Sequence, residues 1–250
     1  MTVDFVFTPP RQAAVPIAGG GYFPVRRIFC IGKNYGAHVA EMGGDPKSDP
    51  PVFFTKPADA IVNCPDDGNA IVPYPPGTNN LHFEGELVIA LSGGGRQLKT
   101  RQEAGGLIFG QAVGCDLTRR DLQNSAKAHG GPWDTAKAFD HSAPLGSIGR
   151  ITDFPPDLFD DASLETMING EQRQHAPLSE MIWSVPEIII ELSSLFDLYP
   201  GDLVFTGTPA GVGALQVGDR VEVSVGPLPK LSFAMGAPKD GGAVAEEELV

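Results

Sequence analysis

Hydrophobic and polar residues alternate from Leu81 to Leu91, a pattern that predicts a β-strand. Side chains of a strand point alternately to opposite faces, so Phe83 and Leu87 point one way while Glu84 and Glu86 share the other face. Two carboxylates side by side repel each other, and burial increases the repulsion. A hard divalent cation, which prefers carboxylate oxygens, would cancel it. The alternative is the solvated outer face of an edge strand.

Other stretches of the chain have patterns typical of strands, helices and turns. Ser184 and Glu187 have the spacing of a capping box before the apolar segment Ile188–Phe196, which predicts a helix packed on the sheet. Asn169 and Gly170 form a dipeptide typical of a hairpin turn. Further predicted elements are strands at Val25–Gly32, Leu107–Thr118 and Arg220–Val225 and a helix at Arg119–Lys127.

The composition favours short strands joined by tight turns. Glycine (31 residues) and proline (23) together make up more than a fifth of the 250-residue chain. We therefore expect an α+β fold dominated by β-structure. We expect an N-terminal arm (1–24), a single catalytic domain (25–236) and a flexible acidic tail (237–250). The central part is taken as one domain because no linker or repeat divides it.

Net charge and cysteine content exclude several classes of function. The formal charge of −13 and the lack of a Lys/Arg cluster argue against a nucleic-acid surface. No apolar run approaches the length of a membrane span and the N-terminus is unlike a signal peptide, so we expect a cytoplasmic protein that does not bind membranes. The three cysteines lack metal-type spacing, and Cys30 and Cys115 fall in apolar runs typical of buried thiols.

A histidine and a glutamate form a candidate base in a short helix predicted to end before Gly43. His38 and Glu41 are three residues apart, so they lie on the same helical face. A histidine oriented by a carboxylate takes a proton from water near neutral pH. The alternative is an ordinary surface pair.

Three further positions are candidates for chemistry. Asp116 ends a buried strand, where it serves either as a third metal ligand or as a helix N-terminal charge. Lys137 is an isolated lysine in an irregular loop (130–140), either functional or at the surface with only its stem buried. The glycine-punctuated loop 206–213 is suited to present backbone N–H groups and a threonine hydroxyl to a carboxylate, or it is only a tight turn.

Four segments in this order resemble the fumarylacetoacetate hydrolase family: 30–35 with His38 and Glu41, 82–87, 114–123 and 206–213. The resemblance implies the family's mixed β-sandwich roll of the C-terminal-domain type and a homodimer. It also implies Mg²⁺ or Mn²⁺, with Ca²⁺ as a substitute, held by Glu84, Glu86 and Asp116.

Roles for the remaining candidates follow from the same resemblance. It implies that His38 and Glu41 form a catalytic dyad on a lid segment, with Lys137 as a third catalytic residue. Lys33, Gln123 and Thr208 would bind the substrate. Many relatives carry arginine at the position of Lys33, and the loss of a bidentate fork changes how a carboxylate is held.

The function implied is hydrolysis of a carbon–carbon bond in a ketonic substrate. Segments 45–57 and 131–137 are similar to hydrolases of fumarylpyruvate in gentisate-type aromatic catabolism, so the expected substrate is an acylpyruvate, a small 2-oxo acid. Oxaloacetate decarboxylation and 2-oxo acid tautomerisation would use the same metal site, and a non-catalytic metal-binding dimer is a third alternative. A fumaryl group has a second carboxylate that needs a cation, and candidates near in sequence are Arg119, Arg120, Lys127 and His129.

Overall fold

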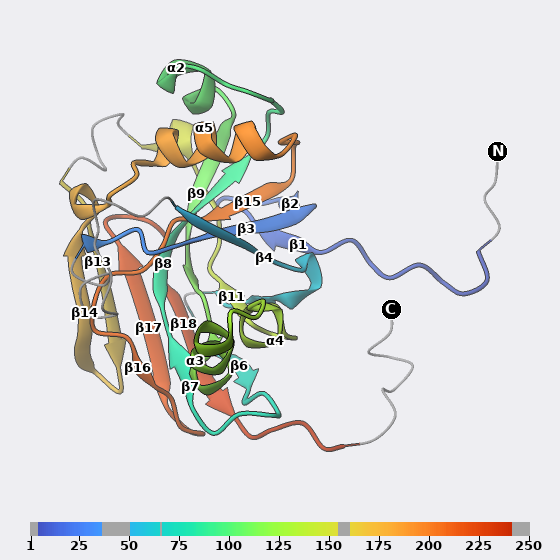
Figure 1. Ribbon diagram of the computed structural model, residues 1–250, viewed down its shortest axis with the longest axis vertical. Coiled ribbons are helices and arrows are strands. Elements are labelled where there is room, and N and C mark those ends of the chain that lie inside the picture. Colours follow the sequence, from blue (N-terminus) through green and yellow to red (C-terminus); the bar gives the residue numbers. More distant parts are fainter. Residues whose placement is uncertain (1–4, 37–50, 66, 155–160, 242–250) are drawn as a thin grey trace.

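The computed structural model describes residues 5–36, 51–65, 67–154 and 161–241. Strands predominate over helices and are arranged in sheets that curl around a common core (Figure 1). The expected α+β fold, dominated by strands in a mixed β-roll, is confirmed. Among the described residues no helix is both long and apolar enough to span a membrane.

The largest sheet has eight strands and contains the segments that carry the site. Its order is β4-β3-β15-β8-β9-β11-β5, with β12 paired to β9. Its members are β3 (Arg27–Gly32), β4 (Val52–Lys56), β5 (Ile61–Asn63), β8 (Gly85–Leu91), β9 (Ile108–Cys115), β11 (Ala143–Leu145), β12 (Gly149–Arg150) and β15 (Asp202–Phe205). Every residue of β8 is buried, because neighbouring strands pair with both its edges and other parts of the fold cover both its faces.

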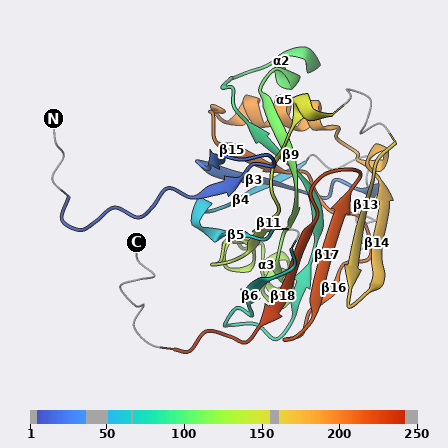
Figure 2. The same ribbon diagram turned by 180° about the vertical axis from the view of Figure 1, so that it is seen from behind.

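A second sheet of five strands packs beside the first. Its order is β14-β13-β17-β18-β6, from β6 (Ala70–Pro73), β13 (Ser163–Ile168), β14 (Glu171–Pro177), β17 (Arg220–Val225) and β18 (Leu231–Gly236). Figure 2 shows β17 and β18 running beside β9, and β13 and β17 contact β8. The main core lies between the sheets and includes Leu87, Val113, Leu164 and Val223, all at most 2% exposed.

The helices lie at two places on the sheets. Helix α5 (Val185–Leu195) lies across the upper end of the large sheet in Figure 1, next to α2 (Arg101–Gly105), while α3 (Arg120–His129) and α4 (Asp134–Lys137) lie together lower down. Short 3₁₀ turns occur at Ala58–Ala60, Ile151–Asp153 and Leu178–Glu180. The predicted capping box is confirmed, because the carboxylate of Glu187 accepts hydrogen bonds from the backbone N–H (2.9 Å) and hydroxyl (2.6 Å) of Ser184.

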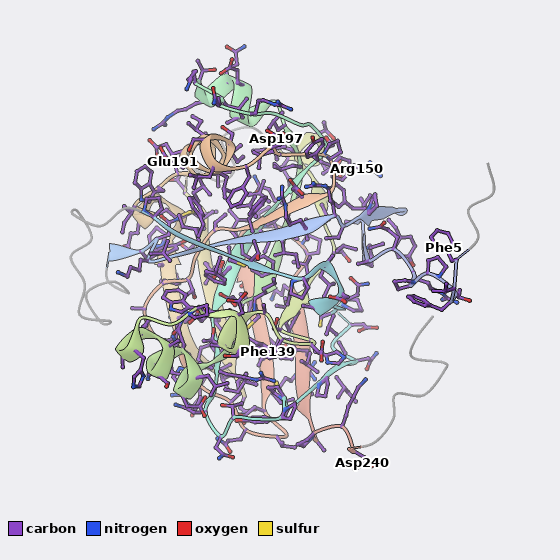
Figure 3. All side chains as sticks on the ribbon, turned by 45° about the vertical axis from the view of Figure 1, so that its right-hand side comes forward. Phe5, Phe139, Arg150, Glu191, Asp197 and Asp240 are labelled. Atoms are coloured by element: carbon purple, nitrogen blue, oxygen red, sulfur yellow. The ribbon has the colours of Figure 1, made fainter. Side chains whose placement is uncertain are left out.

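Part of the segment expected to be an arm forms a hairpin. Strands β1 (Ala14–Pro16) and β2 (Tyr22–Pro24) pair antiparallel, and Val15 and Phe23 are buried in a second apolar cluster with residues of the large sheet. The residues before β1 extend away from the sheets, as Phe5 shows in Figure 3. The chain therefore joins the packed core well before the expected boundary at residue 25.

The prediction of a single strand over Leu81–Leu91 is wrong, because the chain passes from one sheet to another in the middle of this segment. Strand β7 (Leu81–Phe83) pairs with β10 (Thr118–Arg119) and β16 (Gly213–Ala214) in a small sheet, whereas β8 belongs to the large one. The backbone between them bonds elsewhere: Glu84 O accepts from Asp116 N–H (2.8 Å) and Gly85 N–H donates to the Gln174 side chain (3.0 Å). Glu84 and Asp116 thus both lie where a strand ends.

Most other sequence predictions agree with the structure. Strands β3 and β17 and helices α3 and α5 occupy the predicted segments. The predicted strand Leu107–Thr118 is partly wrong, because β9 ends at Cys115 and Thr118 belongs to β10 in the small sheet. Asn169 and Gly170 have φ of +53° and +81°, as a hairpin turn between β13 and β14 requires. The prediction of an irregular loop at 130–140 is partly wrong, since this segment contains the helical turn α4. The backbone N–H groups of Lys137 and Ala138 donate to the carbonyls of Trp133 and Asp134.

A glycine in β9 lets the aromatic ring of Phe205 pack against the sheet. A Cβ at Gly114 would lie 2.7 Å from both Phe205 Cε1 and Val88 Cγ2. We expect Gly114→Ala to lower the free energy of unfolding by about 1–3 kcal/mol through overpacking, measured by urea denaturation. Gly105→Ala, whose Cβ meets no described atom within 4 Å, is the control and should leave the free energy of unfolding unchanged or raise it by up to about 1 kcal/mol. Equal effects of the two variants would contradict the packing argument.

Candidate functional site

Three carboxylates meet in the interior at the ends of paired strands. Oxygens of Glu84, Glu86 and Asp116 all lie within 4.8 Å of one another, and the residues are only 5%, 1% and 1% exposed. They are brought together because β8 and β9 pair, with Glu86 opposite Gly114, while Glu84 and Asp116 stand where these strands end. The alternative of a solvated outer face is therefore excluded.

Lys137 binds two of the three carboxylates. Its Nζ donates to Glu84 Oε2 (2.8 Å), Asp116 Oδ2 (2.5 Å) and Thr118 Oγ1 (2.6 Å), which uses all three ammonium protons. Burial alone would lower the pKa of Lys137, but Asp116 and Glu84 outweigh it and raise the pKa above its ordinary value. The side chain is 2% exposed, so the alternative of a surface lysine is wrong.

Two further buried cations complete the charge balance. Lys56, at the end of β4, pairs with Asp116 Oδ1 (2.8 Å) and donates to the carbonyls of Leu117 (3.2 Å) and Lys137. Arg120, from the first turn of α3, bonds Glu84 Oε1. Three buried cations therefore face three buried acids. Sequence reasoning missed Lys56, whose only signal is a lysine at the end of an apolar strand.

Glu86 is the carboxylate with the fewest compensating charges. Its Oε2 accepts the backbone N–H of Gly207 (2.7 Å). Burial raises the pKa of Glu86 well above its usual range, and repulsion from Asp116 and Glu84 raises it further. Gly207 reaches this position because it has φ of +92° and lies so close to Asn34 that a Cβ would approach the Asn34 Cβ to 2.7 Å. Asn34, also missed from sequence, holds the turn by donating to Thr206 O (2.7 Å).

Every predicted site residue that the structure describes lines one small cavity of about 20 Å³, enough for a single water-sized occupant. Its walls are Ile31, Gly32, Lys33, Phe54, Glu84, Glu86, Asp116, Arg120, Gln123, Trp133, Lys137 and Thr208. His38 and Glu41 lie outside the described residues, so the dyad stays a prediction.

The three predicted substrate-binding residues hold defined positions around this cavity. Lys33 has φ of +62°, a conformation that is uncommon outside glycine and places the residue at the turn after β3. Gln123 is buried on α3 and accepts from Arg120 Nη1 (2.5 Å). The Thr208 hydroxyl donates to Gly85 O (2.8 Å) and accepts from Gln174 Nε2 (2.8 Å), so its proton is already used within the protein.

A larger pocket adjoins the cavity. It has a volume of about 520 Å³ and is mainly apolar, with walls from Phe29, Val52, Phe53, Phe54, Thr55, Pro132, Trp133, Asp134, Lys137 and Phe196. Phe54, Trp133 and Lys137 line both spaces, and the rings of Phe54 and Trp133 are 5.9 Å apart. A small organic acid with one end at the carboxylates thus has room for its other end here.

The donor set fits a divalent metal ion. Carboxylate oxygens are the ligands of hard cations such as Mg²⁺ and Mn²⁺, and three of them converge on one small space. The Lys137 ammonium, which bridges Glu84 and Asp116, shows that these two carboxylates are stabilised by a positive charge beside them. With a metal ion bound, such a site would present a Lewis acid and a lysine to an oxygen-rich anion.

Comparison with known proteins shows one matching family and several similar enzymes. The model of the family described as fumarylacetoacetate (FAA) hydrolase C-terminal matches residues 27–235. A crystal structure of fumarylpyruvate hydrolase from Pseudomonas aeruginosa in complex with Mn²⁺ and pyruvate is 42% identical, with a TM-score of 0.89 over 94% of this chain and 100% of that one. A fumarylpyruvate hydrolase from Ralstonia is 37% identical over 74% of this chain and 92% of its own length. The oxaloacetate tautomerase YcgM of Escherichia coli is 38% identical over 81% and 89%.

The raised pKa of Glu86 predicts a pH dependence of the metal-free protein. Its protonated form is favoured in the folded state, so this contribution to stability is present at low pH and is lost as pH rises through the raised pKa. Glu86→Gln stays neutral. We expect the Tm of the EDTA-treated wild type to fall more than that of Glu86→Gln between about pH 5 and about pH 8.

Glu103 provides the control for this measurement. Hydrogen bonds from the backbone of Lys99 and Thr100 lower the pKa of this exposed carboxylate on α2, so it is ionised over the whole interval. The Tm of Glu103→Gln should therefore run parallel to that of the wild type. A Glu86→Gln profile that also runs parallel to the wild type would show that Glu86 does not carry the pH dependence.

Proposed function

Because this chain belongs to the fumarylacetoacetate hydrolase family, we propose that it is a metal-dependent hydrolase that cleaves the carbon–carbon bond of an acylpyruvate, converting fumarylpyruvate to fumarate and pyruvate. The observation that carries the proposal is the buried cluster of Glu84, Glu86 and Asp116, two of which, Glu84 and Asp116, are paired with Lys137. The similarity to fumarylpyruvate hydrolases at 42% and 37% identity supports this substrate.

The three carboxylates would hold Mg²⁺ or Mn²⁺, with Ca²⁺ as a substitute. When bound, the ion supplies Lewis-acid polarisation to the carboxylate and keto oxygens of the 2-oxo acid. The Mn²⁺ and pyruvate in the Pseudomonas aeruginosa enzyme support a site of this kind. Gln123, Lys33 and Thr208 line the same cavity as the three carboxylates, so they would face the 2-oxo acid end of a substrate held by the ion.

The steps of the proposed hydrolysis require particular residues of this chain. Water adds to the distal carbonyl carbon, and His38, oriented by Glu41, takes the proton from that water. The bond between this carbon and the neighbouring methylene then breaks, and its electron pair passes to the pyruvate fragment as an enolate, which a proton converts to pyruvate. Lys137 would stabilise the negative charge of this fragment after exchanging one of its three present acceptors for a substrate oxygen.

Oxaloacetate tautomerisation is the second candidate. The Escherichia coli tautomerase is 38% identical, and an enolised 2-oxo acid at the same carboxylates requires no attacking water. Decarboxylation of oxaloacetate would use the same enolate. Hydrolysis needs a base that activates water, whereas tautomerisation and decarboxylation do not, so the role of His38 distinguishes hydrolysis from the other two reactions.

The remaining expectations are parts of the same proposal. We propose a homodimer that acts in the cytoplasm on a small 2-oxo acid, with one catalytic domain over residues 25–236. The match of the family model to residues 27–235 supports this extent of the domain. The charge of −13 supports the expectation that nucleic acid is not a partner.

The absorbance decay of fumarylpyruvate, acetylpyruvate and oxaloacetate with purified protein tests the function. We expect hydrolysis of fumarylpyruvate with Mg²⁺ or Mn²⁺ and its loss in excess EDTA. His38→Ala should lower kcat by about 100-fold or more, the range typical of losing a general base.

Three outcomes would each contradict part of the proposal. Turnover of oxaloacetate alone would assign the site to a tautomerase or decarboxylase. Hydrolysis by His38→Ala at the wild-type rate would reject the assigned base. No turnover of any 2-oxo acid with saturating Mn²⁺ would leave the protein as a non-catalytic metal-binding member of the family.

A further inference from the structure

A single glycine separates two of the three carboxylates of the site. Gly85 lies between Glu84 and Glu86, so the two peptide groups that flank it determine where both carboxylates point. The second sheet packs directly against this glycine. A Cβ at Gly85 would lie 2.3 Å from Thr166 Oγ1 and 2.9 Å from Val223 Cγ1, so a larger residue does not fit without displacing these side chains.

The side chain of Gln174 reaches this glycine from the outermost strand of the second sheet (Figure 2). Gln174 lies on β14 opposite Thr166 of β13 and is 1% exposed. Its Oε1 accepts the backbone N–H of Gly85 (3.0 Å), and its Nε2 donates to Thr208 Oγ1 (2.8 Å) and Pro209 O (2.9 Å). The amide thus uses its oxygen and both of its protons. A backbone N–H on one side and a carbonyl on the other determine which way the amide is turned.

Three of these hydrogen bonds form a closed ring. Gly85 donates to Gln174, Gln174 donates to Thr208, and the Thr208 hydroxyl donates back to Gly85 O (2.8 Å). Both peptide groups that flank Gly85 are therefore held, one through its N–H and the other through its C=O. Rotation of either peptide group would break the ring and leave a buried polar group unpaired, which is costly.

The same glutamine also holds the loop 206–213. Its Nε2 fixes Pro209 O, and a Cβ at Gly211 would lie 2.1 Å from Arg173 O, so the loop touches the backbone of β14 at this point. The loop in turn supplies the N–H of Gly207 to Glu86 Oε2 (2.7 Å). One side chain of the second sheet thus joins the two segments that keep the glutamates of the site in place.

We propose that Gln174 is a positioning residue of the metal site. Through Gly85 and Thr208 it directs the carboxylates on either side of Gly85 into one cavity. The inference rests on the proposed function only in taking these carboxylates as metal ligands. Gln174 is not one of the residues that line the cavity, so it supplies no ligand itself. Its loss should weaken metal binding by releasing the two peptide groups.

Calorimetric titration of the metal-free protein with Mn²⁺ tests the proposal. Gln174→Met has a side chain of similar length that makes none of the three hydrogen bonds, and it should weaken Mn²⁺ binding by about 10-fold or more. Thr208→Val opens the same ring at its other side chain and should have a similar effect. The double variant should bind Mn²⁺ about as weakly as either single variant, because each substitution alone already opens the ring.

Two further variants are controls for this measurement. Thr166→Val removes a buried hydroxyl that lies beside Gly85 but has no hydrogen-bond partner among the described residues, so Mn²⁺ affinity should stay unchanged. Ser193→Ala, in α5 at the upper end of the large sheet in Figure 1, removes the acceptor of Leu98 N–H (2.9 Å). It should lower stability in urea without weakening Mn²⁺ binding, and so separates loss of positioning from loss of stability.

An unchanged Mn²⁺ affinity in either folded single variant, or additive losses in the double variant, would overturn the proposal. Equal weakening in Ser193→Ala would also overturn it, because the effect would then follow from lower stability. If the wild type binds Mn²⁺ but hydrolyses no 2-oxo acid, the proposed function fails, while the affinities of the variants still decide the role of Gln174. Absence of Mn²⁺ binding by the wild type would overturn both.

Discussion

The burial of three carboxylates within one small space is the constraint on which the rest of the structure depends. Each buried acid carries a desolvation penalty and repels the other two, so cations must be placed beside them. They come from three separate elements: Lys56 from β4, Arg120 from α3 and Lys137 from α4. The ion pairs therefore tie the edge of the large sheet and both lower helices to the centre of the fold, and they position the side chains that a substrate would meet.

The convergence of the acids follows from how the strands end. The chain leaves the small sheet at Phe83 and enters the large one at Gly85. It later leaves the large sheet at the end of β9, at Cys115, and returns to the small sheet at Thr118. Glu84 and Asp116 lie at these transitions, where backbone groups bond to each other and to Gln174 instead of continuing one ladder. The same arrangement that interrupts regular pairing thus creates a buried site, with a larger apolar space beside it for the remainder of a small acid.

Sequence reasoning succeeded where local pattern and chemistry agree, as at the Ser184 capping box, the Asn169–Gly170 turn and the meeting of Glu84, Glu86 and Asp116. It failed at Leu81–Leu91, because the alternation of apolar and polar residues continues across the change of sheet. Lys56 gave almost no signal, since only tertiary packing shows that its ammonium reaches Asp116. The burial of Lys137 likewise depends on α4 being held against β4, which no local pattern encodes. The roles of His38 and Glu41 stay predictions.

Mn²⁺ binding by the EDTA-treated protein, followed by isothermal titration calorimetry, tests the central claim most directly. If the three carboxylates form a metal site, the wild type binds one Mn²⁺ per chain at a single saturable site. Asp116→Asn removes one anionic ligand, and it should weaken binding by about 10-fold or more. Absence of saturable binding to the wild type, or an unchanged affinity in Asp116→Asn, would contradict the assignment and leave the cluster as a structural ion-pair network.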